Sequence, residues 1–221
     1  MPTRPDVFRR RAPRALLRRL TGGQPPAVRA RERDLTVMFT DIVGFTRLAE
    51  SLGHAAVAEL LEHHVAALAA RIERERGVVH KVLGDGLLAF WDTVHAGAAP
   101  AAPALRAALA IRAAVEADNA TRAARGLARI RLRIGLHTGP LVMAALGASG
   151  RLGVTPLGDT VNVAQRLEDA ARHVADGREV TIVASEAVVA RAGRGFRFEP
   201  LGELPVRGRR DPVRAFSLAG A

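Results

Sequence analysis

The sequence of 221 residues contains no cysteine. A disulfide framework and thiolate chemistry are therefore excluded, and any metal ion would be held by oxygen or imidazole ligands. No apolar run approaches the roughly 20 residues that a membrane-spanning helix needs. The N-terminus also lacks the apolar segment and cleavage site of a signal peptide, so we expect a cytoplasmic protein.

Several familiar catalytic patterns are missing as well. The chain has no H-E-x-x-H, no G-x-S-x-G and no dinucleotide-binding glycine pattern, which disfavours hydrolase and Rossmann-type functions. The glycines of residues 147–153 lack the spacing of a phosphate-binding loop and its following Lys-Ser/Thr, so we expect them to form a hairpin tip.

The net charge of +11 is concentrated at the N-terminus. Residues 1–33 hold ten arginines against Asp6 and Glu32, which accounts for +8 of that charge. We expect residues 1–32 to be a flexible, solvated leader and residues 33–221 to form one folded domain. The leader could also make a weak membrane or regulatory contact, or bind RNA. Its shortage of aromatic residues for base stacking argues against RNA, so no nucleic-acid partner is expected.

The apolar periodicity predicts an α+β fold rather than a doubly wound parallel sheet. Residues 34–42 alternate as a strand, and helical spacing runs from His54 to Arg76, where we expect His63 and His64 to lie at the surface. The other predicted elements are a helix over 100–121, strands over 129–137 and 141–146 separated by a turn at 138–140, a helix capped by Asp159 or Thr160, a strand over 179–183, a short helix from Ser185, and two or three terminal strands.

One hairpin stands out because of its turn and its lysine. Residues 77–91 place two apolar runs around Gly-Asp-Gly, so Asp85 is predicted at the tip. Taken alone, such a turn is most often a solvent-exposed loop. Lys81, four residues earlier, is the only lysine among 33 basic side chains, which indicates a position that needs a compact ammonium rather than a guanidinium.

A second carboxylate, Asp41, ends the first predicted strand beside a glycine-containing turn. Two carboxylates at turns suit hard divalent cations that also bind phosphate, and a pair of such ions can assist an in-line displacement. On the later helix, Asn162 and Arg166 are spaced i and i+4 and share one face, where the arginine could stabilise developing negative charge. These residues together indicate phosphoryl or nucleotidyl transfer.

Three segments resemble the signatures of class III adenylyl/guanylyl cyclase catalytic domains. They are Phe39-Thr-Asp-Ile-Val-Gly-Phe-Thr46, Lys81-Val-Leu-Gly-Asp85 and Leu157-Gly-Asp-Thr-Val-Asn-Val-Ala-Gln-Arg166. The resemblance implies a ferredoxin-like βαββαβ core with additional strands. It also implies an active site formed where two domains meet head to tail, which converts ATP to 3′,5′-cyclic AMP and pyrophosphate.

The resemblance assigns roles to individual residues. Asp41 and Asp85, with the Ile42 backbone carbonyl, match the ligands of two divalent metal ions, Mg²⁺ or Mn²⁺. Lys81 matches the residue that hydrogen-bonds adenine, where guanylyl cyclases have a glutamate. Asn162 and Arg166 match the residues that orient the ribose and stabilise the transition-state phosphate.

Two positions depart from the commonest family pattern. Thr155 stands where an aspartate often pairs with Lys81 in reading adenine, as in a bacterial subgroup that includes bicarbonate-responsive members. Its hydroxyl can still accept a hydrogen bond from the adenine amino group. Arg207 stands where many relatives have a triphosphate-binding lysine, and it keeps the charge.

All of these roles are present in one chain, so a homodimer would contain two equivalent sites. The leading hypothesis is an adenylate cyclase. The alternatives are a guanylate cyclase, a catalytically silent dimerisation or nucleotide-binding module of the same fold, and a basic RNA-binding protein supported only by the leader.

Overall fold

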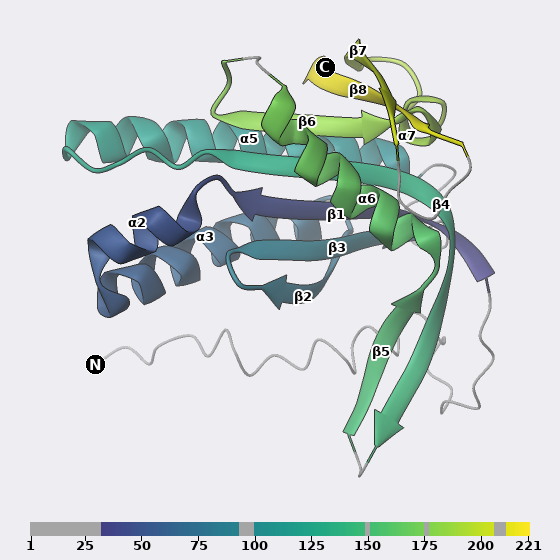
Figure 1. The fold of residues 1–221 in the computed structure, drawn as a ribbon, viewed down its shortest axis with the longest axis horizontal. Coiled ribbons are helices and arrows are strands. Elements are labelled where there is room, and N and C mark those ends of the chain that lie inside the picture. Colours follow the sequence, from purple (N-terminus) through teal and green to yellow (C-terminus); the bar gives the residue numbers. More distant parts are fainter. Residues whose placement is uncertain (1–31, 93–99, 149–150, 175–176, 206–210) are drawn as a thin grey trace.

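The computed structural model describes residues 32–92, 100–148, 151–174, 177–205 and 211–221, with the backbone alone at 145–148 and 151–155. Figure 1 shows one twisted sheet with helices on both faces. The elements are β1 (Glu32–Ile42), α2 (Phe45–Leu52), α3 (His54–Arg74), β2 (Val78–Leu83), β3 (Gly86–Asp92), α5 (Ala101–Ala124), β4 (Leu132–Ala148), β5 (Arg151–Leu157), α6 (Asp159–Ala170), the 3₁₀ turn η2 (Ala171–His173), β6 (Val180–Ser185), α7 (Glu186–Val189), β7 (Arg197–Leu204) and β8 (Val213–Gly220).

The sheet confirms the predicted α+β class and the ferredoxin-like core. Its strands are ordered β2-β3-β1-β4-β6-β8-β7, and β5 pairs with β4 outside this path. The elements β1, α3, β2, β3, α5 and β4 follow one another as βαββαβ, and their four strands lie in the order β2-β3-β1-β4. Neighbouring strands are antiparallel except β4 and β6, which are parallel.

The two faces of the sheet bury different side chains because residues alternate along each strand. Met38 and Ile42 of β1 join the main core beneath α3 and α5. Leu35, Val37 and Phe39 lie on the opposite face, in the cluster that includes Ala164 of α6. Asp41 has the same parity as this second set, so β1 presents it on the α6 face. Figure 1 shows α6 crossing the sheet on this face, with α3 and α5 behind it.

The predicted turn at residues 138–140 is wrong, because β4 runs unbroken through it. Pro140 pairs with Asp34 of β1, and the other edge of β4 is bonded to β6 only up to Leu136 and to β5 only from Val142. A proline lacks the N–H that a strand donates, and the interval between β6 and β5 is an edge where that donor is not needed. The hairpin tip expected after β4 is confirmed by the pairing of Ala148 with Arg151.

The start of α6 also differs from the prediction. Gly158 occupies the N-cap position and no side-chain hydrogen bond caps the helix. Thr160 instead donates from Oγ1 to the Pro140 carbonyl at 2.7 Å, which ties α6 to β4. A second close approach lies at Gly135, where an added Cβ would be 2.2 Å from the Ala164 carbonyl oxygen and 2.3 Å from the Glu168 nitrogen. The helix therefore rests directly on the backbone of β4.

Two further expectations concern the periphery. The surface position predicted for His63 and His64 holds only for His63, because His64 is 5% exposed. It shares the helical face of Leu68 and Ile72, which are also buried. The predicted leader, with its possible membrane or regulatory contact, lies outside the described residues apart from Glu32, where β1 begins. No described helix combines the length and apolarity needed to cross a membrane.

Candidate active site

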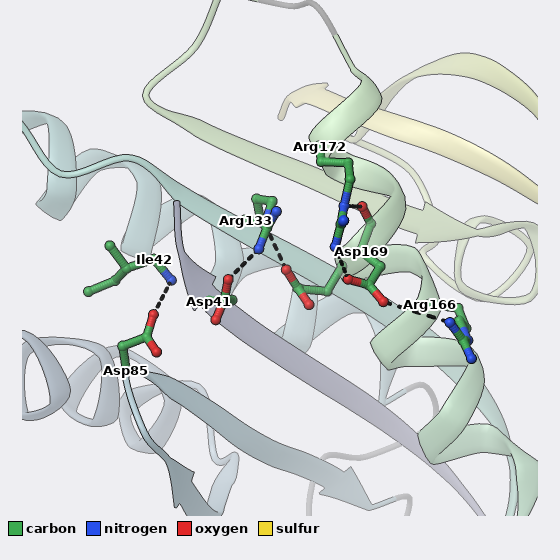
Figure 2. A network of polar contacts seen from close by, with 8 residues as sticks. Asp41, Ile42, Asp85, Arg133, Arg166, Asp169 and Arg172 are labelled. Carbon is green, nitrogen blue, oxygen red and sulfur yellow. Dashed lines mark hydrogen bonds and ion pairs between the residues drawn. The ribbon is translucent and has the colours of Figure 1, made fainter. Parts of the chain in front are cut away.

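Asp41 and Asp85 are brought together by the packing of the β2–β3 hairpin against β1. Asp41 lies at the end of β1 on the α6 face, and Asp85 lies in the two-residue turn between β2 and β3. The Ile42 backbone N–H donates to Asp85 Oδ2 at 3.1 Å, which fixes the turn against the end of β1 (Figure 2). Two residues 44 positions apart in the chain thus come close enough for the Asp41 charge to raise the pKa of Asp85.

The hairpin can approach β1 this closely because the turn is built from glycines. Gly84 has a φ of +65°, a left-handed conformation that glycine adopts readily. A Cβ on Gly86 would lie 2.1 Å from the Thr40 carbonyl oxygen. Both glycines of the Gly-Asp-Gly segment are therefore required by the geometry that holds Asp85 beside Ile42.

The surroundings of Asp85 raise the pKa of its carboxyl group. Partial burial raises its pKa, the nearby Asp41 raises it further, and the hydrogen bond from the Ile42 N–H opposes both effects. Two carboxylates that destabilise each other's charge would be stabilised together by a cation between them. The donor chemistry therefore fits a divalent metal ion.

The residues also suit a cation that keeps part of its own coordination shell. No cluster of three or more His, Asp or Glu side chains suited to a metal occurs among the described residues. A cation bound here would rely on the two carboxylates, a backbone carbonyl and oxygens from water or phosphate. Mg²⁺ and Mn²⁺ accept this kind of incomplete oxygen set.

Arg133 on β4 joins Asp41 to α6. Its Nη2 donates a short hydrogen bond to Asp41 Oδ2, and its Nε lies 2.8 Å from Glu168 Oε1 (Figure 2). Burial raises the pKa of Glu168 to about 7, although the Arg133 charge opposes this. Burial lowers the pKa of Arg133, but the bond to Asp41 and the charge of Glu168 outweigh it and raise the pKa overall.

Neither member of this pair is predicted from the sequence. Arg133 is one of three alternating arginines, and nothing in its spacing identifies a partner 92 residues away. Glu168 did carry a signal, because it lies on the buried side of α6 beside Ala164 and Leu167. An acidic residue on an apolar stripe indicates a buried partner.

The candidate catalytic residues of α6 are exposed. Asn162 and Arg166 lie on the solvent side of the helix, as their spacing predicted. Arg166 is 3.9 Å from Asp169, whose carboxylate also holds Arg172. In Figure 2 Arg166 lies on the side of Asp169 away from Asp41. No contact within the described part of the chain joins Asn162 or Arg166 to the aspartate pair.

Lys81 is exposed on β2, the edge strand of the sheet. The register with β3 shifts between Val79 and Lys81, so His80 is an extra residue in the ladder and packs on Phe90 at 5.3 Å between ring centres. None of the described residues forms an ion pair with Lys81. Within the described part of the chain, its ammonium is left exposed to solvent.

For the two remaining candidates, Thr155 and Arg207, the structure describes less. Thr155 lies on β5 with its backbone paired to Ala144, and its side chain is outside the described part. Arg207 lies outside the described residues altogether. The structure thus brings Asp41, Ile42 and Asp85 together and leaves Lys81, Asn162 and Arg166 apart from them.

The class of protein follows from this geometry and from comparison with known families. Residues 28–220 match the sequence model of the family described as the adenylate and guanylate cyclase catalytic domain. The chain therefore belongs to this family, and the resemblance drawn from its three motifs is confirmed.

Several relatives carry names. Adenylate cyclase 1 of Rhizobium meliloti is 34% identical over 188 residues, which is 85% of this chain and 28% of that protein. Adenylate cyclase 2 of the same organism is 33% identical over 188 residues, which is 85% of this chain and 50% of that protein. The chain thus spans half or less of the length of these relatives.

Solved structures agree on the fold. The crystal structure of the adenylyl cyclase CyaB from P. aeruginosa is 25% identical, has a TM-score of 0.80, and covers 88% of this chain and 97% of its own. The guanylyl cyclase Cya2 is 24% identical with a TM-score of 0.73, over 87% of this chain and 94% of its own. The second likeness supports the fold alone.

Proposed function

We propose that this chain is an adenylate cyclase that converts ATP to 3′,5′-cyclic AMP and pyrophosphate. The observation that carries the proposal is the pairing of Asp41 and Asp85 around the Ile42 backbone, in a chain that also has Asn162 and Arg166 on α6. The adenylate cyclase names of its relatives, at 34% and 33% identity, favour ATP over GTP.

Asp41, Asp85 and the Ile42 carbonyl would hold two divalent cations, Mg²⁺ or Mn²⁺. When bound, these ions neutralise triphosphate charge and favour ionisation of the ribose 3′-hydroxyl that attacks the α-phosphate. Asp85 is suited to this role because the hydrogen bond from the Ile42 N–H to Oδ2 holds its carboxylate near Asp41.

The other residues bind and orient the nucleotide. Arg166 stabilises the negative charge that builds on the α-phosphate, and Asn162 holds the ribose for in-line attack. Lys81 and Thr155 read the adenine edge. Arg207 binds the triphosphate, and its guanidinium can form two parallel bonds to phosphate oxygens.

The complete site would require a homodimer, in which Lys81 and Arg166 serve the aspartates of the partner. The support for this is the exposure of Lys81 and the distance of Arg166 from Asp41 within one chain. Exposed apolar side chains also flank the candidate residues: Val43 (39%), Val82 (44%), Leu83 (40%) and Leu157 (47%). Apolar surface of this kind is characteristic of interfaces.

A direct assay tests the activity. The purified chain is incubated with ATP or GTP and Mn²⁺ or Mg²⁺ at dimer-forming concentration, and cyclic nucleotides are separated chromatographically. We expect cyclic AMP from ATP, and loss of turnover in Asp41→Ala and Asp85→Ala without loss of the dimer. No cyclic nucleotide from either substrate would favour a silent nucleotide-binding module, and cyclic GMP alone would make the chain a guanylate cyclase.

A mixing experiment tests the composite site. Asp85→Ala and Arg166→Ala should each be inactive alone, but a mixed dimer contains one intact site, with Asp85 from one chain and Arg166 from the other. Random pairing of equal amounts should therefore restore about a quarter of the wild-type activity. Mixed dimers that form but stay inactive would show that both residues serve the same chain's site.

A further inference from the structure

The Arg133 guanidinium lies between carboxylates from two different elements. Asp41 at the end of β1 accepts from its Nη2, and Glu168 of α6 lies 2.8 Å from its Nε. The Arg133 side chain is 16% exposed and that of Glu168 is 9% exposed, so water screens this ion pair only weakly. Asp169, the next acidic residue of α6, is held by Arg166 and Arg172.

The Asp41 carboxylate therefore has two competing uses. Its Oδ2 is bonded to Arg133 in this structure, while the proposed function assigns the same carboxylate to a divalent cation. Asp85, the other proposed ligand, is bonded to a neutral backbone N–H rather than to a cation. A positive charge fixed at one of two metal-binding carboxylates opposes the arrival of a second cation.

We infer that Arg133 is the resident counter-cation of Asp41, and that Glu168 alone retains the guanidinium when a divalent cation binds Asp41. The inference rests on the proposed metal site. It assigns Arg133 and Glu168 to positioning roles, because neither needs to touch the nucleotide. Arg133 neutralises the Asp41 charge when no metal ion is bound. Glu168 competes with Asp41 for the guanidinium and so determines how easily a metal ion displaces Arg133 from Asp41.

This exchange would couple metal binding to the helix that carries the catalytic candidates. Glu168 lies one turn or less from Arg166 on α6, and its backbone nitrogen is packed against Gly135 of β4. When Asp41 is occupied by a metal ion, the Arg133 charge is balanced by Glu168 alone, which strengthens the link between β4 and α6. Metal loading should therefore hold Asn162 and Arg166 more firmly over the sheet.

Substitutions of Arg133 and Glu168 should change the affinity for metal ions in opposite directions. Arg133→Gln keeps an amide that can hydrogen-bond Asp41 but removes the competing charge, so Mn²⁺ should bind about tenfold more tightly. Glu168→Gln leaves the whole Arg133 charge to Asp41, so Mn²⁺ should bind about three- to tenfold more weakly. A merely structural role would weaken binding in both variants.

The experiment measures Mn²⁺ binding by the full chain without nucleotide, from the paramagnetic resonance signal of the free ion. It is run at about pH 8, above the pKa of about 7 of Glu168, so that this carboxylate is ionised. The control is Arg191→Gln, which removes the same charge from an exposed pair with Asp34 near the opposite end of β1 and should leave the affinity unchanged.

Deuterium exchange provides a second reading. Mn²⁺ should slow exchange of the α6 amides, residues 159–170, in the wild type but not in Arg133→Gln. Weaker Mn²⁺ binding by a folded Arg133→Gln variant, or unchanged binding by Glu168→Gln, would overturn the inference. A different result would contradict the proposed metal site itself: Asp41→Asn that binds Mn²⁺ as tightly as the wild type does.

Discussion

Replacement of Gly135 by alanine should reduce catalytic activity by displacing α6 from the sheet. The new Cβ would lie 2.2 Å from the Ala164 carbonyl oxygen, 2.3 Å from the Glu168 nitrogen and 2.9 Å from the Glu168 Cα. All three are backbone atoms, so no rotamer change relieves the contact, and reaching ordinary van der Waals separation requires α6 to move by about 1 Å. That helix carries Asn162 and Arg166.

The substitution should slow catalysis even though the domain stays folded. Overpacking of this kind costs about 1–3 kcal/mol of the free energy of unfolding. A displacement of about 1 Å in groups that orient and stabilise a transition state costs about 100-fold in rate. The assay is cyclic AMP formation, measured well below the unfolding temperature, together with urea unfolding monitored by circular dichroism.

A matched control separates displacement from destabilisation. Gly126→Ala forces a side chain onto a residue with a φ of +68° but meets no atom within 4 Å, and it lies after α5, away from α6. It should lose about 1 kcal/mol of stability and keep its activity. A Gly135→Ala enzyme that folds and turns over at nearly the wild-type rate would refute the reasoning that α6 must rest on the β4 backbone.

Three other substitutions have definite expected outcomes. Lys81→Glu should lower the preference for ATP over GTP at least tenfold, as measured by kcat/KM for each substrate, since the ammonium that we propose binds adenine is replaced by a hydrogen-bond acceptor. Gly86→Ala places a Cβ 2.1 Å from the Thr40 carbonyl oxygen and should abolish Mn²⁺ binding at Asp41 and Asp85, with unaltered binding counting against the role of this close approach. Burial lowers the pKa of His64 to about 4 from 6.5. About 3 kcal/mol of stability that is present above pH 6.5 should therefore be lost as the pH falls to 4, because the unfolded chain binds the proton more readily. In urea unfolding across that range, this pH-dependent loss should disappear in His64→Leu and persist in His63→Leu.

Much of the fold was accessible from sequence because hydrophobic alternation and glycine turns act locally. The Gly-Asp-Gly hairpin is an example, since both strands and the tip position of Asp85 follow from a short segment. The break predicted at Thr138-Gly-Pro140 failed because strand continuity there depends on which neighbours lie along β4. Only the assembled sheet shows that this part of the β4 edge is bonded to neither β5 nor β6.

The sequence motifs named candidate residues but not the contacts that join them. The motifs identified Asp41, Asp85 and Arg166, because each belongs to a short characteristic segment. The bond from the Ile42 N–H to Asp85 and the bridge from Asp41 through Arg133 to Glu168 join residues 35 to 92 positions apart. Periodicity carries no information about such pairings. The burial of His64 was more accessible, because the residue shares the apolar face of α3 with Leu68.

The unbroken course of β4 gives the domain a parity rule. Successive residues of a strand face opposite ways, so Arg133 and Gly135 lie on the α6 face only while their residue numbers differ by an even number from those of the other residues on that face. Deleting one residue between Leu136 and Val142 would preserve the pairing at one end of β4 and invert every side chain at the other. The length of this strand can therefore change only in steps of two without exchanging the face that carries Arg133 for the face that forms the main core.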